Sequence, residues 1–213
     1  MRAARHLMIF TKRLRLLGTM ALVLVLLALP TGCTTTVVAP AKVQRPVTVY
    51  LLDHGITPSL VLPAKGDRMV RYMYGDWEWY ARGNQNAWRG FLALFVPTQG
   101  ALGRDEFPAV KSADALRDAL AVGFDEVFEI EVERERAVAL SRDIESQFNS
   151  AADTSILNEG NRARFAHHPQ SYIYFANSNH MVAAWLRELG CETRGPAFYS
   201  SWKVKPARTD ERR

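Results

Sequence analysis

The stretch VTVYLLDHGITPSLVLP, residues 47–63, decides the fold of this chain. Residues 47–52 are β-branched or apolar without a break, a pattern that is typical of a buried strand. Asp53-His54-Gly55 supplies turn residues, and residues 59–62 form a second apolar run that Pro63 ends. The stretch therefore predicts two consecutive strands joined by a turn.

Apolar periodicity on the C-terminal side of this stretch predicts further strands and helices. The clearest helix covers residues 134–148, where apolar side chains recur at helical spacing on one stripe. We also expect helices over 86–95, 112–120 and 179–189, strands over 126–133, 171–175 and 199–204, and either state over 69–74. This mixture predicts an α+β fold with a sheet packed against helices.

Composition and charge exclude several classes of protein. The chain has 213 residues, of which 48% are hydrophobic and 23% charged, so it is neither disordered nor collagen-like. Two cysteines cannot form a disulfide framework or a cysteine-rich zinc module. The net charge of +5 suggests nucleic-acid binding at first, but residues 1–32 hold five basic residues and no acidic one. The remainder is formally neutral, with 22 basic and 22 acidic residues, which argues against a nucleic-acid partner.

The N-terminal segment has the pattern of a secretory signal peptide. A basic start is followed by an apolar run over residues 16–29. That run is short for a membrane span, which needs roughly 20 apolar residues. The alternative interpretation is an uncleaved membrane anchor.

Residues 29–33 read Leu-Pro-Thr-Gly-Cys and resemble the lipobox of bacterial lipoproteins, with Pro30 where that family has Leu. The resemblance implies that residues 1–32 are a signal peptide and that Cys33 becomes an acylated N-terminus. Acyl chains such as palmitate contribute about 0.8 kcal/mol per buried CH₂ group to membrane binding. Thr34, rather than Asp, follows the cysteine, which implies an outer membrane location facing the periplasm.

The segment that follows the lipobox is expected to be a tether. Residues 33–46 contain Pro40 and Pro46 and lack an amphipathic period, which is typical of an extended linker. The folded domain is then predicted over residues 47–205, with a flexible tail over 206–213. We find no internal repeat in the sequence.

Three short motifs resemble an uncharacterised bacterial lipoprotein family with an NlpC-type, circularly permuted papain-like fold, sometimes labelled urease-associated. The first is the stretch 50–63, and the second is YGDWEWY at 74–80, with Tyr74 in the place of the family's Trp. The third is YFANSNHMVAAWLRELG at 174–190. The resemblance implies one domain with a mostly antiparallel central sheet. It also implies a cysteine at a helix N-terminus, where the helix dipole favours the thiolate, and a histidine from the sheet.

This sequence departs from the family pattern at both catalytic positions. Ser178 stands where the family has cysteine, and Thr57 stands where it has histidine. A serine hydroxyl needs a base within hydrogen-bond reach, and Thr57 cannot serve as one. The sequence therefore predicts a non-catalytic binding or scaffold domain. The alternative is a hydrolase or acyltransferase of amide or ester bonds, with Ser178 as nucleophile and His54 as base. His180 is a poor candidate for the base, because residues i and i+2 of a helix do not face each other.

Several other side chains are candidates for ligand binding. They flank the second and third motifs and are Tyr74, Asp76, Trp77, Trp79, Asn177, Asn179 and His180. The aromatic ones form either a ligand-facing wall or part of the core, and Asp76 is a candidate cap for the turn that follows it. The partner would be an envelope peptide, lipid or protein.

The remaining histidines and cysteine predict no metal site and no cofactor. His167 and His168 are adjacent and point to opposite faces of a strand, which suits no single metal ion. Cys191 follows the helix-ending Gly190 and is expected to be an unreactive free thiol.

Overall fold

The computed structural model describes residues 34–86, 90, 95–120 and 122–207. The chain divides into two compact units, residues 1–33 and 34–213, and the description concerns the second. The signal peptide, Cys33 and most of the expected 86–95 helix and C-terminal tail lie outside the described residues. No helix within the described part of the chain is long and apolar enough to span a bilayer.

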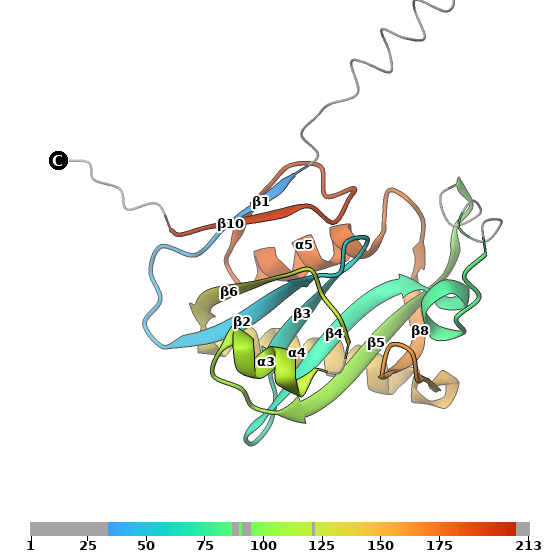
Figure 1. Cartoon of the computed structure of the whole chain (residues 1–213), viewed down its shortest axis with the longest axis horizontal. Coiled ribbons are helices and arrows are strands. Elements are labelled where there is room, and N and C mark those ends of the chain that lie inside the picture. Colours follow the sequence, from blue (N-terminus) through green and yellow to red (C-terminus); the bar gives the residue numbers. More distant parts are fainter. Residues whose placement is uncertain (1–33, 87–89, 91–94, 121, 208–213) are drawn as a thin grey trace, which may run out of the picture. The chain divides into compact units, whose positions relative to one another are not determined.

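A mixed α+β fold with a large antiparallel sheet is confirmed (Figure 1). The seven strands pair in the order β6-β2-β3-β4-β5-β8-β7, and every neighbouring pair is antiparallel. Their bounds are β2 (Pro46–Asp53), β3 (Pro58–Pro63), β4 (Arg68–Asp76), β5 (Thr98–Pro108), β6 (Glu126–Glu133), β7 (Ile156–Asn158) and β8 (Ala163–Tyr172). The stretch 47–63 forms the predicted strand–turn–strand, and residues 69–74 are strand rather than helix.

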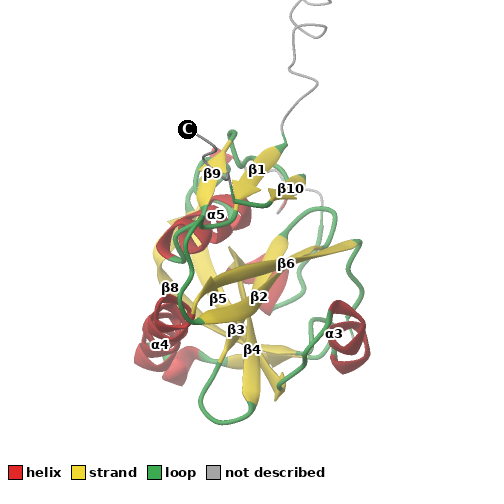
Figure 2. Cartoon of the chain, turned by 90° about the vertical axis from the view of Figure 1, so that its left-hand side faces the viewer, coloured by secondary structure: helices red, strands yellow, loops and turns green. Residues whose placement is uncertain are grey.

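Helices cover the two faces of this sheet unequally (Figure 2). Helices α4 (Arg134–Ser150) and α5 (Ser178–Glu188) pack on one face, and the shorter α3 (Ala113–Ala119) packs on the other. Ser112 caps α3 as predicted, because its hydroxyl accepts a hydrogen bond from the Ala115 amide at 3.2 Å. Gly190, with φ of +91°, follows the end of α5 in the left-handed conformation that glycine tolerates best.

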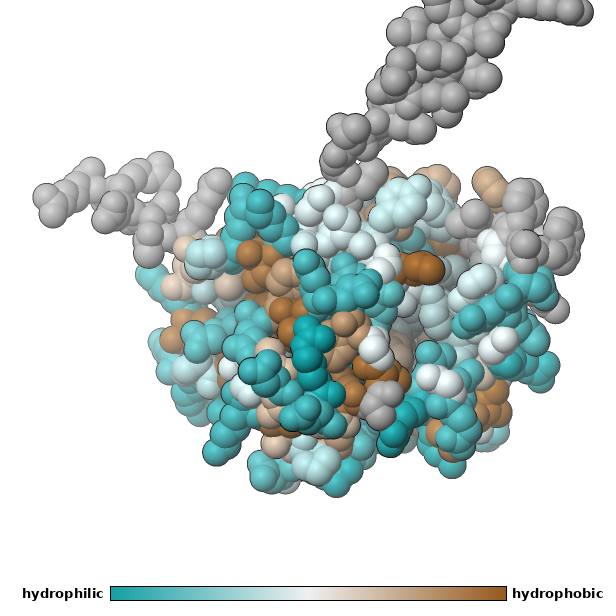
Figure 3. All heavy atoms as spheres, in the orientation of Figure 1, coloured by the Kyte–Doolittle hydropathy of each residue, from teal (hydrophilic) through white to brown (hydrophobic). Residues whose placement is uncertain are grey.

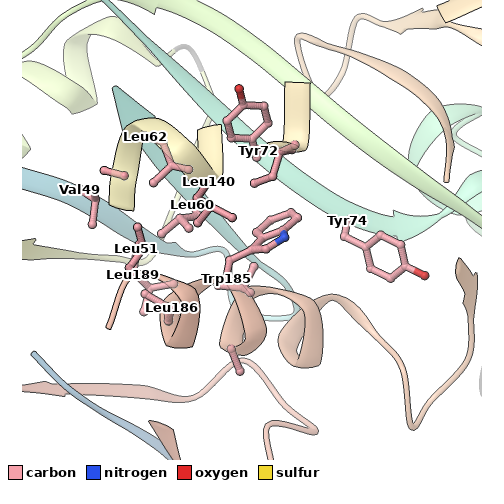
Figure 4. Packing of buried hydrophobic residues seen from close by; sticks show 14 of the residues in the cluster. Val49, Leu51, Leu60, Leu62, Tyr72, Tyr74, Leu140, Trp185, Leu186 and Leu189 are labelled. Carbon is pink, nitrogen blue, oxygen red and sulfur yellow. The ribbon is translucent and has the colours of Figure 1, made fainter. Parts of the chain in front are cut away.

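The main core lies between the sheet and the α4 and α5 helices. The surface seen in Figure 3 is mostly polar, whereas the side chains in Figure 4 are apolar and come from β2, β3, β4 and both helices. Leu60 and Leu62 alternate with Ser59 and Val61, so one pair faces the helices and the other pair faces away. This alternation makes the two faces of the sheet chemically different.

A second, three-stranded sheet corrects the expected tether. Residues 35–38 form β1 (Thr35–Val38), which pairs in parallel with β10 (Trp202–Lys205) and antiparallel with β9 (Glu192–Arg194). Val37 is fully buried in the main core, and α5 lies between the two sheets (Figure 2). The prediction missed this strand because four residues are too few to reveal a period, and the strand is stabilised by partners about 160 residues away.

Strand β8 also differs from the prediction of a strand over 171–175. It spans residues 163–172, so it begins eight residues before the predicted start and includes Pro169. The pairing of β8 with β5 shifts register between Thr98 and Gly100, opposite this part of β8. A proline is tolerated there because the irregularity relieves the need for its missing N–H donor. The short helical turns η1 (Trp77–Ala81) and η2 (Ala152–Thr154) complete the described elements.

Candidate functional site: a cavity lined by a buried arginine

Ser178 is the first residue of helix α5. Its side chain is 1% exposed, and its hydroxyl oxygen makes no hydrogen bond within the described structure. The phenol of Tyr172 lies beside this hydroxyl, without reaching hydrogen-bond geometry. The Ser178 hydroxyl therefore has no base within hydrogen-bond reach among the described residues.

His54 is not that base, so the alternative Ser178–His54 pair is not formed. The His54 Nδ1 atom lies 2.9 Å from the Gly123 carbonyl oxygen, and Nε2 lies 2.8 Å from the Ser59 hydroxyl. Because a carbonyl only accepts, Nδ1 carries the proton, and Nε2 accepts from Ser59. Ser59 alternates with Leu60 and so faces away from α5. The histidine is held on the opposite face of the sheet from the helix that carries Ser178.

Two tyrosines connect the positions of Ser178 and Thr57. Tyr172 lies beside Ser178, and Tyr80 lies beside Thr57. Burial raises the pKa of both phenols, and the proximity of Tyr80 raises the pKa of Tyr172 further. Both phenols are therefore protonated at neutral pH. Phenol groups, rather than a base, therefore lie beside both Ser178 and Thr57.

The polar residues at the start of α5 cap the helix. The Asn177 side-chain oxygen accepts hydrogen bonds from the amides of Asn179 and His180, and from the His180 Nδ1 atom at 2.9 Å. Its amide group donates to the Phe198 carbonyl at 3.0 Å. Asn177, Asn179 and His180 were candidate ligand-binding residues, and this geometry explains them as an N-cap and its surroundings.

The second motif also proves to be structural. Asp76 accepts from the Trp79 amide at 2.7 Å and from the Thr98 hydroxyl at 2.5 Å, which confirms the predicted turn cap. Tyr74 and Trp77 are buried, and only Trp79 is partly exposed. The Tyr74 hydroxyl donates to the Gln170 carbonyl at 3.0 Å. Trp77 packs in the core, which was the alternative to a ligand-facing wall, whereas the buried Tyr74 also lines the cavity described below.

A cavity of about 340 Å³ lies beside the turn between β2 and β3. It is lined by His54, Thr57 and Tyr74, three of the residues singled out in the sequence, and by Arg71, which the sequence analysis missed. The described residues that line it are His54, Thr57, Pro58, Arg71, Met73, Tyr74, Tyr80, Val122, Gly123, Gly160, Asn161 and Phe165. Among these residues, Arg71 carries the only permanent charge.

The Arg71 guanidinium is buried with few partners. The residue is 2% exposed, and its Nη2 atom donates to the Asn161 carbonyl oxygen at 2.7 Å. The carboxylate of Asp105 is 3.4 Å from Nη2, and the buried Nε atom has no hydrogen-bond partner in the described structure. Burial lowers the pKa of Arg71, and it also lowers the pKa of His54, which the positive charge of Arg71 lowers further. The cavity therefore joins a buried cation to a neutral imidazole.

Other hollows in the domain lack this chemistry. One of about 700 Å³ lies between residues 39–43, β6 and residues 204–207, and another of about 560 Å³ lies beside α4. The first is larger than the arginine cavity, but no buried charged side chain is among its described lining residues. We assign the candidate site to the smaller cavity, because buried charges require a partner and so point to a ligand.

The remaining sequence candidates have structural environments. His167 packs edge-on against Trp77, and His168 contacts Gln147 through Nε2 at 3.0 Å, so the two rings diverge as predicted. The thiol of Cys191 is free and buried, and burial raises its pKa to about 11, which favours the protonated thiol at neutral pH. Within the described ranges, no three His, Cys, Asp or Glu side chains gather as metal ligands.

Comparisons of the chain with protein-family models, with curated proteins and with solved structures find no match. The site therefore has to be interpreted from its own chemistry. One signal in the sequence could have revealed Arg71, namely a charged residue at the centre of the apolar run MVRYMY at 69–74. In an antiparallel strand that is buried on both faces, such a residue must find a polar environment.

Proposed function

We propose that this protein is a lipid-anchored, non-catalytic binding domain of the bacterial cell envelope, whose cavity holds a small anionic molecule. One observation carries the proposal, namely the 2% exposed Arg71 with one short hydrogen bond and one 3.4 Å ion pair. Arginine has five N–H donors that match a carboxylate or phosphate group. A ligand bearing such a group would supply the acceptors that the protein does not.

The lining of the cavity supports an anion rather than a cation. No Asp or Glu is among the described lining residues, and the Asp105 carboxylate that balances Arg71 is not part of that lining. Tyr80, Thr57 and Asn161 offer uncharged polar groups around the same space. A volume of about 340 Å³ is near the lower end of the range for ligand pockets, roughly 300–1,000 Å³. The ligand would therefore be the size of a small metabolite or a single headgroup.

The geometry around Ser178 supports binding rather than catalysis. The two nitrogens of His54 are engaged by Gly123 and Ser59, and the nearest phenol, on Tyr172, is protonated. The carboxylate of Asp76, which influences that phenol, is itself engaged by Trp79 and Thr98. Without a base, a serine hydroxyl stays protonated even at a helix N-terminus.

The permuted papain-like arrangement is part of the same proposal. It is supported by the order of elements, in which an antiparallel sheet precedes the helix that Ser178 begins. It is also supported by the shared region of Thr57 and Ser178, the positions matched to the family's histidine and cysteine. Acylation of Cys33 rests on the lipobox resemblance, and radiolabelled palmitate incorporation that survives Cys33→Ala would refute it.

A titration of the mature protein with inorganic phosphate, acetate and succinate tests the anion site. Arg71→Gln combined with Asp105→Asn removes both charges of the pair at once, so it avoids stranding one buried charge. We expect the wild type to bind at least one of these anions and the double variant to lose that binding. Arg68→Gln is the matched control, because Arg68 lies on the same strand but its side chain is 47% exposed. Equal binding by the wild type and the double variant, or no binding by the wild type, contradicts the proposal.

A fluorophosphonate probe tests the absence of catalysis. Such probes label serines that are activated by a base, and we expect no labelling of this protein. Labelling that disappears in Ser178→Ala and persists in Ser59→Ala would show an active serine at α5 and overturn the non-catalytic assignment.

A further inference from the structure

The first described residue, Thr34, is attached directly to the folded domain. Its hydroxyl lies 3.1 Å from the Ser201 hydroxyl, and the Thr35 amide donates to the Ser201 carbonyl at 2.8 Å. The buried Thr35 hydroxyl accepts from the Ala197 amide at 3.1 Å. Residue 34 is therefore fixed against the loop of residues 195–201, and no slack chain separates it from the domain.

The same loop carries half of an aromatic cluster, which we call the aromatic edge and define as Tyr174, Phe175, Phe198 and Tyr199. The rings of Tyr174 and Phe198 are stacked at 5.2 Å, and Phe175 packs edge-on against both. The Tyr174 hydroxyl donates to the Tyr199 hydroxyl at 3.2 Å. Phe175 is nevertheless 70% exposed and Tyr199 is 54% exposed. These aromatic surfaces are held rigidly toward solvent beside the point where the chain enters the domain.

Neighbouring groups extend this surface. Ser200 donates to the Asp53 carboxylate at 2.5 Å, which ties the loop to the β2–β3 turn, where Ile56 is 76% exposed. Lys203 and Arg194 lie opposite Thr36 in the three-stranded sheet and are exposed, and the Arg194 guanidinium is paired with the Glu192 carboxylate at 2.7 Å. Figure 3 shows pale and tan side chains along the upper edge, where β1 begins and the loop before α5 lies in Figure 1. Exposed aromatic and apolar residues next to basic ones are typical of surfaces that contact lipid headgroups.

We propose that the aromatic edge is a membrane-contact surface that lies on the same bilayer leaflet as the acyl chains on Cys33. The inference rests on the proposed acylation and adds a second contact to it. Consecutive Cα atoms are about 3.8 Å apart, so an acylated Cys33 brings the leaflet surface within one peptide unit of Thr34. Thr34 is bonded to the 195–201 loop, and this loop must then face the headgroups. Tyr199 and Phe175 are suited to that interface because their rings combine apolar area with tolerance of water.

The test uses the acylated mature protein in phosphatidylethanolamine vesicles that contain phosphatidylglycerol. An environment-sensitive fluorophore is attached at Pro196→Cys, an exposed position in the 195–201 loop, and in a separate variant at Leu157→Cys, which is exposed on β7. Cys191 is buried and does not compete for the label. We expect the fluorophore at residue 196 to shift to the blue and to be quenched by lipids with brominated acyl chains. The fluorophore at residue 157 should behave as in water.

A flexible Gly-Ser linker inserted between Cys33 and Thr34 tests whether the aromatic edge binds the membrane by its own affinity or is only held close to it by the anchor. With the linker, quenching at residue 196 should persist, and it should be lost when Phe175→Ser and Tyr199→Ser are added. Loss of quenching with the linker alone, or its persistence without the two aromatic rings, overturns the membrane-contact surface. The mass of the mature N-terminal peptide keeps the two proposals distinct: an unacylated Cys33 refutes both, whereas an acylated protein with a water-exposed fluorophore at residue 196 refutes only this one.

Discussion

Arg71 and Tyr72 are neighbours in one strand, yet they enter opposite faces of the seven-stranded sheet with very different partners. The Tyr72 phenol lies 3.2 Å from each of three oxygen atoms, two on Ser141 and one on Glu145, against α4. The Arg71 guanidinium has one short hydrogen bond and a distant carboxylate. Both side chains are at least 98% buried. The buried polar group on one face thus has its hydrogen-bond partners, whereas the buried charged group on the other face keeps unused donors.

The difference follows from how the helices cover the sheet. Two helices pack on the Tyr72 face and bury apolar side chains against it, as Figure 4 shows, and they leave a hollow of about 560 Å³ beside α4 with no unpaired buried cation among its described lining residues. On the Arg71 face, α3 packs over only part of the sheet, and the remaining space is the cavity. A fold gains most of its stability from a face that is filled, whereas it can bind a ligand only where space and polar groups remain.

The largest effect should come from the filled face. Trp185 is 4% exposed and packs between α5 and the sheet, so Trp185→Ala removes a large apolar side chain and leaves a cavity. We expect the free energy of unfolding to fall by about 3–5 kcal/mol in chemical denaturation. Anion binding by the remaining folded protein should be unchanged. A loss below about 1 kcal/mol would show that this face is not the stabilising one.

A smaller effect on stability is expected on the cavity face, where one substitution should lower the free energy of unfolding and raise the affinity for phosphate. Asp105→Asn removes the carboxylate that the described structure pairs with Arg71, so the free energy of unfolding should fall by about 1–3 kcal/mol. The same change removes a competitor for the guanidinium, and phosphate affinity should increase. Denaturation and phosphate titration of the variant, with the exposed Asp67→Asn as control, measure both effects. Weaker phosphate binding in Asp105→Asn would count against Arg71 as the anion-binding group.

The pH dependence of stability should be set by buried neutral histidines. His168 donates through Nε2 to Gln147, while Nδ1 accepts from the Gln170 amide, and burial lowers its pKa. Below a pH of about 6.5, His168 is protonated in the unfolded chain but remains neutral in the folded protein. The free energy of unfolding therefore falls as the pH falls from that value. The expected slope is up to about 1.4 kcal/mol per pH unit for one histidine.

Urea denaturation of the wild type and of His168→Gln between pH 7 and pH 5 would measure this slope. The variant should lose less stability on acidification, and the slope that remains would come from His54 and His180, whose pKa values burial also lowers. Equal slopes in the two proteins would show that His168 titrates alike in the folded and unfolded states.

The smallest effect should occur at Ser178. Its buried hydroxyl has no hydrogen-bond partner in the described structure, so Ser178→Ala removes a polar group that makes no stabilising hydrogen bond in the folded protein. We expect the free energy of unfolding to change by less than about 1 kcal/mol, and in the stabilising direction. A clear destabilisation in thermal and urea denaturation would reveal a partner for this hydroxyl and would reopen the question of an activated serine.

Much of the fold could be predicted from local patterns. The strand–turn–strand of 47–63, the stripe of α4 and the Ser112 cap follow from periodicity and turn chemistry, which depend on residues close in the sequence. Strand β1 and the course of β8 through Pro169 could not be predicted, because distant partners and an irregular pairing stabilise them. The candidate site could be predicted only in part: His54 and Thr57 stood out as residue types, whereas Arg71 was not singled out, although it is a charged residue inside an apolar run.

The sequence alone determined which residues could form strands and helices, where a lipid anchor is expected, and that the chain after residue 32 is formally neutral. Only the tertiary structure decided that His54 turns away from Ser178, because that outcome depends on the face of β3 that Ser59 occupies. It also decided that Arg71 lines a cavity and that Thr34 meets the aromatic edge. Local sequence encodes the period of an element, but the environment of a side chain is set by segments that meet only when the chain folds.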